Sequence, residues 1–257
     1  MGNLDAQHAF VTGGGSGIGL ACAKAFAADG ATVTITGRSE SRLHDALEEL
    51  GDGHAAISLD VADEGAVEEA VKQAHERIPI TIAVANAGTG AAHPFFDTPA
   101  QSWREVMSTN LDGTFYTFKH AGQAIAERGG AMCAVSSIAG LRTHRLMSAY
   151  TTSKAAIDML VRNAADELGV MGVRVNSVCP GLVVTELSRG LYETDPIRED
   201  YLACMPVARL GQVEDIAHAV RFLCGPEASW VTGVVMPVDG GHHLRRGPDL
   251  LAGTKPS

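Results

Sequence analysis

Tyr150 and Lys154 form the pattern in this chain that most directly indicates chemistry. An apolar pattern typical of a helix continues from them to about residue 169, and residues four apart share one face of a helix. Their side chains should therefore point into the same space. A phenol has a pKa near ~10, and an adjacent ammonium favours its ionised form. The pair is a candidate proton donor and acceptor, although Tyr-x-x-x-Lys alone is also common on ordinary surface helices.

Ser137 and Asn110 are candidates for assisting that chemistry. Ser137 follows an apolar segment, residues 131–135, that is typical of a strand. Its hydroxyl could stabilise charge on a substrate oxygen, or it could be an ordinary turn residue. Asn110 lies in the middle of a helical pattern over residues 100–128, where asparagine is a mediocre helix former. It could hold a water near Lys154 or simply occupy a surface position.

A glycine-rich turn separates a short strand pattern, residues 9–11, from a helix pattern that ends at Gly30. A second strand, residues 32–36, completes a βαβ unit. Such a turn lets the backbone approach a pyrophosphate at the helix N-terminus. The spacing Gly-x-x-x-Gly-x-Gly differs from the usual G-x-G-x-x-G motif. The turn therefore resembles that motif in how it would bind a pyrophosphate and not in its spacing. We predict a dinucleotide site that includes Gly13, Ser16, Gly17, Ile18 and Gly19.

The cofactor preference depends on the residue that follows the second strand. NAD sites usually place an acidic residue there to bind the ribose 2′-hydroxyl, whereas this chain has Arg38. An arginine can pair with the 2′-phosphate of NADP, or it can be a solvated loop charge. We favour NADP(H), with NAD(H) as the other possibility.

Two further expected strands, residues 55–59 and 80–85, also end in polar or small residues. Ligands of parallel sheets bind beyond the carboxyl ends of the strands. The aspartate at the first of these ends could contact an adenine amino group or cap the next helix. The additional candidate cofactor contacts at the two ends are Asp60, Val61, Asn86, Ala87 and Gly88.

Composition excludes several classes of function. The chain has 257 residues, of which 46% are hydrophobic, and the net charge of −10 argues against nucleic-acid or anionic-membrane partners. The five cysteines are scattered without a C-x-x-C pair, which fits reduced thiols and neither a disulfide framework nor a zinc site. There is no signal-peptide pattern and no apolar run of the ~18 residues that a membrane helix needs. We expect a cytoplasmic protein without a metal.

Six motifs, in order and at familiar spacing, resemble the short-chain dehydrogenase/reductase family. They are Thr12-Gly13-x-x-x-Gly17-x-Gly19, Asn86-Ala87-Gly88, Asn110, Ser137, Tyr150-x-x-x-Lys154 and Pro180-Gly181. The resemblance covers about residues 7–241. It implies an α/β fold, a single Rossmann-type domain of three layers with a seven-stranded parallel sheet, and NAD(P)-dependent oxidoreduction. One departure is that the family often has Asn-Asn-Ala-Gly where this chain has Ala85 before Asn86.

The resemblance also implies roles for individual residues. Tyr150 would be the acid/base, Ser137 would position the substrate oxygen, and Lys154 would hold the nicotinamide ribose and lower the pKa of Tyr150. Asn110 would support a water in the proton relay. Thr185 resembles the family's threonine that contacts the nicotinamide carboxamide, and an arginine after the second strand usually accompanies NADP. Further cofactor contacts implied nearby are Pro180, Gly181 and Val183. The resemblance further implies a homotetramer or homodimer that packs through the helices carrying Asn110 and Tyr150.

Substrate choice should depend on residues 89–96, 141–148 and 182–206, the last being long enough for a lid. Four leucines in these segments suggest an apolar pocket for a hydrophobic ketone or secondary alcohol, or else ordinary core packing. They are Leu141, Leu146, Leu182 and Leu187. His144 and Arg145 are candidate contacts for a polar tail such as phosphopantetheine.

We predict one catalytic NAD(P)-binding domain over residues 1–245, followed by a tail over residues 246–257. The adjacent pair His242-His243 is interpreted as a surface feature. The leading hypothesis is an NADP(H)-dependent oxidoreductase that transfers a hydride between the nicotinamide and a small ketone or secondary alcohol. The alternatives are a 3-oxoacyl-thioester (CoA or ACP) reductase and, from another class, a non-catalytic dinucleotide-binding sensor.

Overall fold

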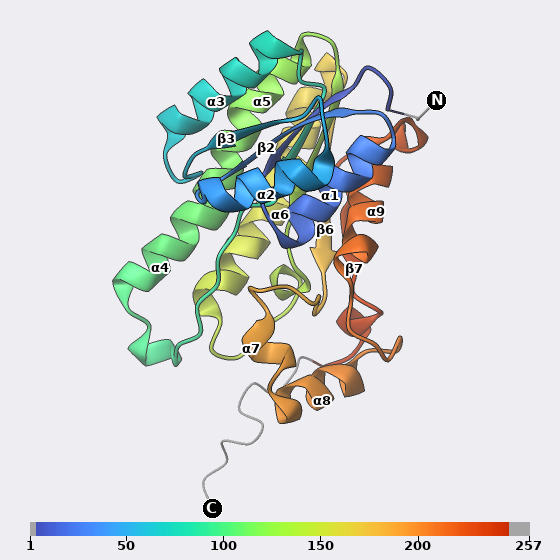
Figure 1. Ribbon diagram of the computed structural model, residues 1–257. Coiled ribbons are helices and arrows are strands. Elements are labelled where there is room, and N and C mark those ends of the chain that lie inside the picture. The colour runs from blue at the N-terminus through green and yellow to red at the C-terminus, as the bar shows by residue number, and fades with distance from the viewer. Residues whose placement is uncertain (1–3, 247–257) are drawn as a thin grey trace, which may run out of the picture.

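The computed structural model describes residues 4–246, which form a parallel sheet between two layers of helices (Figure 1). The seven strands have the order β3-β2-β1-β4-β5-β6-β7, and every pairing is parallel. The strands are β1 (His8–Thr12), β2 (Thr32–Gly37), β3 (Ala55–Ser58), β4 (Ile82–Ala85), β5 (Gly130–Val135), β6 (Val173–Pro180) and β7 (Val235–Val238). The predicted α/β fold of Rossmann type is confirmed.

The helices divide into two layers and a small separate pair. They are α1 (Gly17–Ala28), α2 (Glu40–Leu50), α3 (Glu64–Arg77), α4 (Ala100–Met107), α5 (Gly113–Ala126), α6 (Ser148–Leu168), α7 (Arg189–Tyr192), α8 (Asp195–Cys204) and α9 (Val213–Cys224). The short helices α7 and α8 lie together at the lower end of the molecule in Figure 1. The segment that was expected to be a lid, residues 182–206, is thus partly helical.

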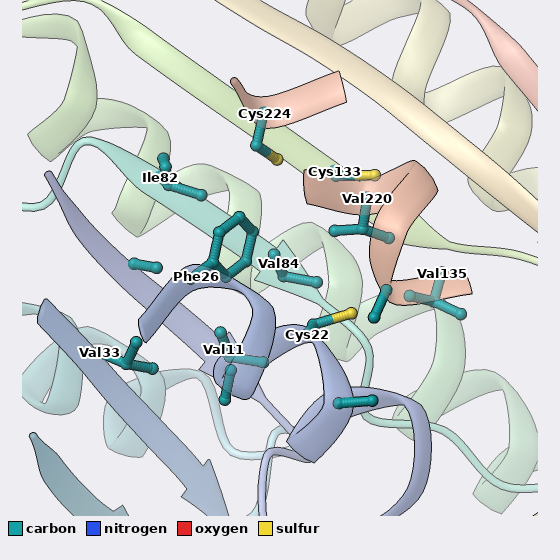
Figure 2. Packing of buried hydrophobic residues seen from close by; sticks show 14 of the residues in the cluster. Val11, Cys22, Phe26, Val33, Ile82, Val84, Cys133, Val135, Val220 and Cys224 are labelled. Carbon is teal, nitrogen blue, oxygen red and sulfur yellow. The ribbon is translucent and has the colours of Figure 1, made fainter. Parts of the chain in front are cut away.

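Successive residues of the central strands serve opposite faces of the sheet, because side chains alternate along a strand. Ala9 and Val11 join the core beneath α1, α2 and α9, whereas Phe10 joins the core beneath α3, α5 and α6. Figure 2 shows the first of these cores, in which Phe26 of α1 packs among strand valines and Val220 of α9. Both faces are covered, which explains why these strands are almost continuously apolar.

All five cysteines are buried and have free thiols. Three of them, Cys22, Cys133 and Cys224, lie in the core of Figure 2, where α1 and α9 meet the sheet. Burial raises the pKa of the Cys22 thiol, so this sulfur behaves as a small apolar side chain.

Local backbone features set the limits of two elements. The seventh strand begins at Val235, because Gly233 takes a left-handed conformation (φ +73°) before the pairing with β6 starts. The helical pattern over residues 100–128 is interrupted by a π-helical turn, Ser108–Asp112, that contains Asn110. Such a turn inserts one extra residue and is frequent at functional sites.

Among residues 4–246, no helix is both long and apolar enough to cross a membrane. Of the predicted tail, residues 247–257 lie outside the described part of the chain.

Candidate active site

A cavity of about 990 Å³ opens at the carboxyl ends of the strands, where β1 has β2 on one side and β4 on the other. This change of direction in strand order is where open α/β sheets bind their ligands. The candidate residues that line the cavity are Gly13, Ser16, Gly17, Ile18, Arg38, Asp60, Val61, Asn86, Ala87, Gly88, Ser137, Tyr150, Lys154, Pro180, Gly181, Val183 and Thr185. Two candidates, Gly19 and Asn110, do not line it.

The glycine-rich turn has the shape that a pyrophosphate requires. Gly13 and Gly17 have positive φ angles of 64° and 54°, which glycine adopts without the strain of other residues. The N-terminus of α1 opens onto the cavity at Ser16, whose side chain makes no capping bond to the helix. A Cβ at Gly19 would instead overlap the carbonyl oxygen of Gly13. Gly19 therefore lets the helix pack against the turn, and it does not itself line the cavity.

Asn86 connects the turn to the neighbouring strand end. Its Nδ2 donates to the carbonyl oxygens of Thr12 (3.0 Å) and Gly13 (3.1 Å), and its backbone N–H donates to Thr12 Oγ1 (3.0 Å). These bonds fix the relative positions of the ends of β1 and β4. The side chain of Asn86 thereby organises the turn, whereas Ala85 belongs to the apolar core.

Beyond the turn, the cavity wall carries charged side chains of both signs. Arg38 is exposed and follows β2 directly, and no carboxylate occupies the positions of β2 or the turn after it up to Ser39. Arg42 pairs with Glu186 across the cavity at 2.9 Å. Asp60 Oδ1 accepts from the N–H of Ala62, whereas the N-cap of α3 is Asp63, so Asp60 does not cap that helix. These residues line the end of the cavity beyond β2 and β3.

The predicted catalytic side chains come together at the end of β5. Lys154 Nζ lies 5.6 Å from the ring centroid of Tyr150 and donates to the carbonyl oxygen of Val135 at 2.8 Å. Ser137, at the end of the same strand, lines the cavity with them. Its Oγ accepts from the N–H of Ala139 at 3.1 Å, so the short 3-10 turn that follows holds the hydroxyl in place.

The electrostatics of the pair differ from the prediction. Burial lowers the pKa of Lys154 to about 8, partly offset by the charge of Asp158. Burial also raises the pKa of Tyr150, and the Ser137 hydroxyl only partly counteracts this. The expected lowering of the Tyr150 pKa by Lys154 is therefore not the dominant effect in the protein alone. The reason is that both groups leave water together, and each desolvation disfavours the charged form.

Asn110 is fully buried, so its interpretation as a surface residue is wrong. Its Oδ1 accepts from the N–H of Thr89 at 2.8 Å, while Nδ2 donates to the carbonyl of Thr89 (2.9 Å) and to Ser153 Oγ (3.0 Å). The π-helical turn aims this amide at the loop after β4, close to Gly88. The structure thus gives Asn110 a clear role in holding that loop beside α6.

Asp158 was missed by the sequence reasoning. It lies one turn beyond Lys154 on the same face of α6, is buried, and accepts from Ser177 Oγ at 3.0 Å. Cys179 Sγ lies 3.8 Å from both of its carboxyl oxygens, and burial raises the pKa of that thiol to about 12. The regular spacing of Tyr150, Lys154 and Asp158 could have indicated it, because residues four apart lie on the same face of a helix.

The substrate end of the cavity lies between the β5–α6 loop and the helices α7 and α8. Of the four leucines expected there, Leu182 and Leu187 line the cavity. Leu141 is 42% exposed, and Leu146 packs into a small core with Tyr201 of α8, so neither lines it. The other side chains at this end include His144, Met147, Leu191 and Tyr201.

The interpretation of His242-His243 as a surface feature is wrong for His242, which is fully buried. Burial lowers its pKa to about 4, and its ring packs edge-on against Tyr201 with centroids 5.5 Å apart. His243 Nδ1 donates to the carboxylate of Asp239 at 3.0 Å. No cluster of three or more potential metal-binding side chains occurs within residues 4–246.

Comparison with known proteins identifies the family of this chain. The sequence model of a family described as enoyl-(acyl carrier protein) reductase matches residues 13–243. A solved structure of a short-chain type dehydrogenase/reductase from Mycobacterium ulcerans superimposes with a TM-score of 0.94 at 39% identity, covering 97% of this chain and 94% of that one. The chain belongs to the short-chain dehydrogenase/reductase family.

Two curated relatives indicate how widely members of this family differ in substrate. Galactitol 2-dehydrogenase (L-tagatose-forming) of Cereibacter sphaeroides is 40% identical over 243 residues, which are 93% of this chain and 96% of the relative. The 7α-hydroxysteroid dehydrogenase of Escherichia coli K12 is 34% identical over 247 residues, 93% and 94% of the two chains. This short-chain dehydrogenase/reductase is accordingly a nicotinamide-dependent oxidoreductase that interconverts alcohol and carbonyl groups.

Proposed function

We propose that this short-chain dehydrogenase/reductase uses NADP(H) to interconvert a small secondary alcohol and its ketone, with Tyr150 as the acid/base. The observation that carries the proposal is that Tyr150, Lys154 and Ser137 line one cavity with the glycine-rich turn and Arg38. A bound nicotinamide would supply or accept the hydride. In the reductive direction the Tyr150 hydroxyl gives its proton to the carbonyl oxygen, while Ser137 donates a hydrogen bond to the same oxygen.

The remaining residues bind and orient. Lys154 contributes an ammonium at the nicotinamide ribose, and Asn110 supports a water that resupplies protons through Lys154. In the oxidative direction the phenolate of Tyr150 accepts the proton of the alcohol. Burial raises the pKa of Tyr150, which stabilises the protonated phenol that the reductive direction requires.

The preference for NADP(H) follows from charge. Arg38 is exposed at the end of β2 and lines the cavity. A guanidinium there forms charge-assisted hydrogen bonds with a 2′-phosphate, whereas NAD offers it only a hydroxyl.

A cytoplasmic homotetramer or homodimer is also part of the proposal. Exposed apolar side chains on α4, α5 and α6 support an oligomer that packs through these helices. They are Trp103, Phe115 and Met159. Five buried, free thiols fit a reducing compartment.

Titration of the purified protein with NADPH and NADH tests the cofactor assignment. We expect NADPH to bind at least tenfold more tightly, and the Arg38→Asp variant to reverse the order. The matched control is Arg128→Asp, at an exposed position after α5 that does not line the cavity. Equal binding of both cofactors by the native protein would refute the NADP preference, and binding of neither would refute the enzyme itself.

A further inference from the structure

The ion pair between Arg42 and Glu186 joins two segments across the cavity and has no part in the chemistry described so far. Arg42 lies in the first turn of α2, whereas Glu186 lies between β6 and α7, 144 positions further along the chain. Both residues line the cavity. The pair therefore connects the cofactor half to residues 182–206, which carry α7 and α8 and are called the α7–α8 segment below.

The geometry of this ion pair is bidentate. Arg42 Nη1 lies 2.9 Å from Glu186 Oε2, and Arg42 Nη2 donates to Glu186 Oε1 at 3.2 Å. A guanidinium presents the same two parallel donors to a phosphate group. The Glu186 carboxylate thus takes up the donors with which Arg42 would bind a phosphate.

Arg42 is a second cation at the end of the cavity where the proposed function places the 2′-phosphate. It follows Arg38 by four residues, and both line the cavity together with Ser39. The stem of Arg42 lies beside the glycine-rich turn, since a Cβ at Gly15 would come within 3.5 Å of Arg42 Cβ. A phosphate bound beside Arg38 would therefore compete with Glu186 for the Arg42 guanidinium.

The ion pair is exposed enough to exchange partners. The side chains of Arg42 and Glu186 are 54% and 58% exposed. Exposed ion pairs are screened by water and salt and contribute little to stability. A phosphate monoester carries about 1.5–2 negative charges near neutral pH, whereas a carboxylate carries one. The phosphate is therefore the stronger partner for the guanidinium.

Glu186 is tied directly to α7. Its carbonyl oxygen accepts from the N–H of Arg189, the first residue of that helix, at 3.2 Å. Leu187, the next residue after Glu186, and Leu191 of α7 both line the cavity at the substrate end. The partner that Glu186 takes therefore affects where α7 lies beside the substrate.

The α7–α8 segment is packed separately from the sheet. Leu182, Tyr201 and Met205 are buried in a small core of their own, around which partly buried residues such as Leu191 pack. This core is distinct from the two cores that cover the faces of the sheet. A shift of α7 consequently leaves the packing of the sheet intact, as in closures that move one packed element against another.

We propose that Glu186 is an internal competitor of the 2′-phosphate of NADP(H). In the free protein Glu186 binds Arg42 and holds the start of α7 toward the cofactor half, and the 2′-phosphate takes its place and releases α7. The inference rests on the proposed function, because it requires a phosphorylated dinucleotide. NAD(H) has only a hydroxyl at that position and leaves the pair intact. Cofactor choice is thereby coupled to the freedom of α7 at the substrate end.

The test uses adenosine 2′,5′-bisphosphate and adenosine 5′-monophosphate, which differ by one phosphate and lack the nicotinamide. Isothermal titration calorimetry at fixed ionic strength gives the ratio of their affinities. Glu186→Gln keeps the shape of the side chain and removes its charge, so the ratio should rise about threefold to fivefold in favour of the bisphosphate. Arg42→Gln should lower the ratio by about tenfold. In the Arg42→Gln background Glu186→Gln should have no further effect, because the competition requires both partners.

Hydrogen exchange of residues 185–192 measures the release of α7 without any turnover. In the native protein the bisphosphate should speed exchange several-fold relative to the monophosphate, and Glu186→Gln should abolish this difference. The matched control is Glu193→Gln, which removes the same charge just after α7 at an exposed position that does not line the cavity. This control should change neither the affinity ratio nor the exchange.

Three outcomes would overturn the competition between Glu186 and the phosphate while leaving the proposed function intact. They are an affinity ratio that Glu186→Gln leaves unchanged although Arg42→Gln lowers it, an equal effect of Glu193→Gln, and exchange that is no faster with the bisphosphate. A native protein that binds both probes alike, with or without the substitution Arg38→Asp, would overturn the NADP preference itself and this inference with it.

Discussion

The two halves of the cavity are built in different ways. The cofactor half, around the glycine-rich turn, depends on the backbone. Gly13 and Gly17 have positive φ angles, and Gly19 packs closely against the turn. The side-chain amide of Asn86 donates hydrogen bonds to backbone carbonyls of the turn. The catalytic half depends on side chains such as Tyr150 that come from separate segments. The cofactor half therefore constrains residue type through the backbone, whereas the catalytic half depends on the chemistry of individual side chains.

The same contrast appears in how polar groups are satisfied. Around the turn, Thr12 and Asn86 form a closed set of hydrogen bonds between strand ends. Beside the substrate end, His144 Nδ1 and both ring nitrogens of His242 have no hydrogen-bond partner within residues 4–246, and the same is true of Thr36 Oγ1 at the end of β2. Hydrogen bonds therefore hold the strand ends together around the turn, whereas the rings beside the substrate end are held by packing.

The largest expected effect is on kcat, and it should distinguish the catalytic half of the cavity from the cofactor half. Tyr150→Phe removes the only hydroxyl proposed to transfer the proton, so kcat should fall by about 10³-fold. Cofactor affinity should change by no more than a few-fold, because the turn that binds the pyrophosphate is untouched. Stopped-flow or initial-rate kinetics together with NADPH titration measure both. Tyr116→Phe on α5 is the control, since that phenol does not line the cavity. A variant that retains most of its kcat would show that another group is the acid/base.

The second-largest expected effect is on the stability of the glycine-rich turn. Gly19→Ala places a Cβ against the Gly13 carbonyl, where only backbone could move away. We expect a loss of about 1–3 kcal/mol of unfolding free energy and weaker cofactor binding. Urea denaturation and NADPH titration give the two quantities. Gly65→Ala in α3 is the control: its Cβ would meet only Asp63 at 3.5 Å, so a helix-favouring gain of up to about 1 kcal/mol is expected. Similar stabilities for the two variants would contradict the assigned packing role of Gly19.

The sequence predicted the cofactor half well because its determinants are local. A glycine turn between a strand and a helix carries the same meaning in any chain, and the residues flanking it line the cavity as predicted. Tyr150, Lys154 and Ser137 were also predictable, since helical spacing and a strand end place them together. For Gly19 the sequence did not reveal the packing against Gly13, because close packing and ligand contact both require glycine.

The substrate end of the catalytic half was less predictable, because the residues that form it come from distant segments of the chain. His144, Tyr201 and His242 come from three segments, and no spacing in the sequence brings them together. An adjacent histidine pair after the last strand gave no sign that His242 would be buried and His243 partly exposed. The buried state of Asn110 likewise depends on a π-helical turn that residue preferences do not reveal.

The smallest expected effect concerns Asp158, which acts on the catalytic half through Lys154. Its charge raises the pKa of Lys154, which burial has lowered to about 8. A Lys154 that must be protonated to hold the ribose would make cofactor capture decline as pH rises through about 8. Asp158→Asn removes the supporting charge, so this decline should begin at lower pH, with a few-fold loss near pH 8 and less at pH 6.

The pH profile of kcat/KM for the cofactor, from pH 6 to 10, measures that displacement. Asp166→Asn, at an exposed position of α6, changes the same net charge and should not move the profile. The pH dependence of the unfolding free energy tests the pKa of Lys154 independently. This pKa is about 8 in the folded protein and 10.5 in the unfolded chain, so the unfolded state binds more protons between these two pH values. The unfolding free energy should therefore rise with pH in that window. A profile that stays in place in Asp158→Asn would mean that the buried carboxylate serves only the packing of α6 against β6.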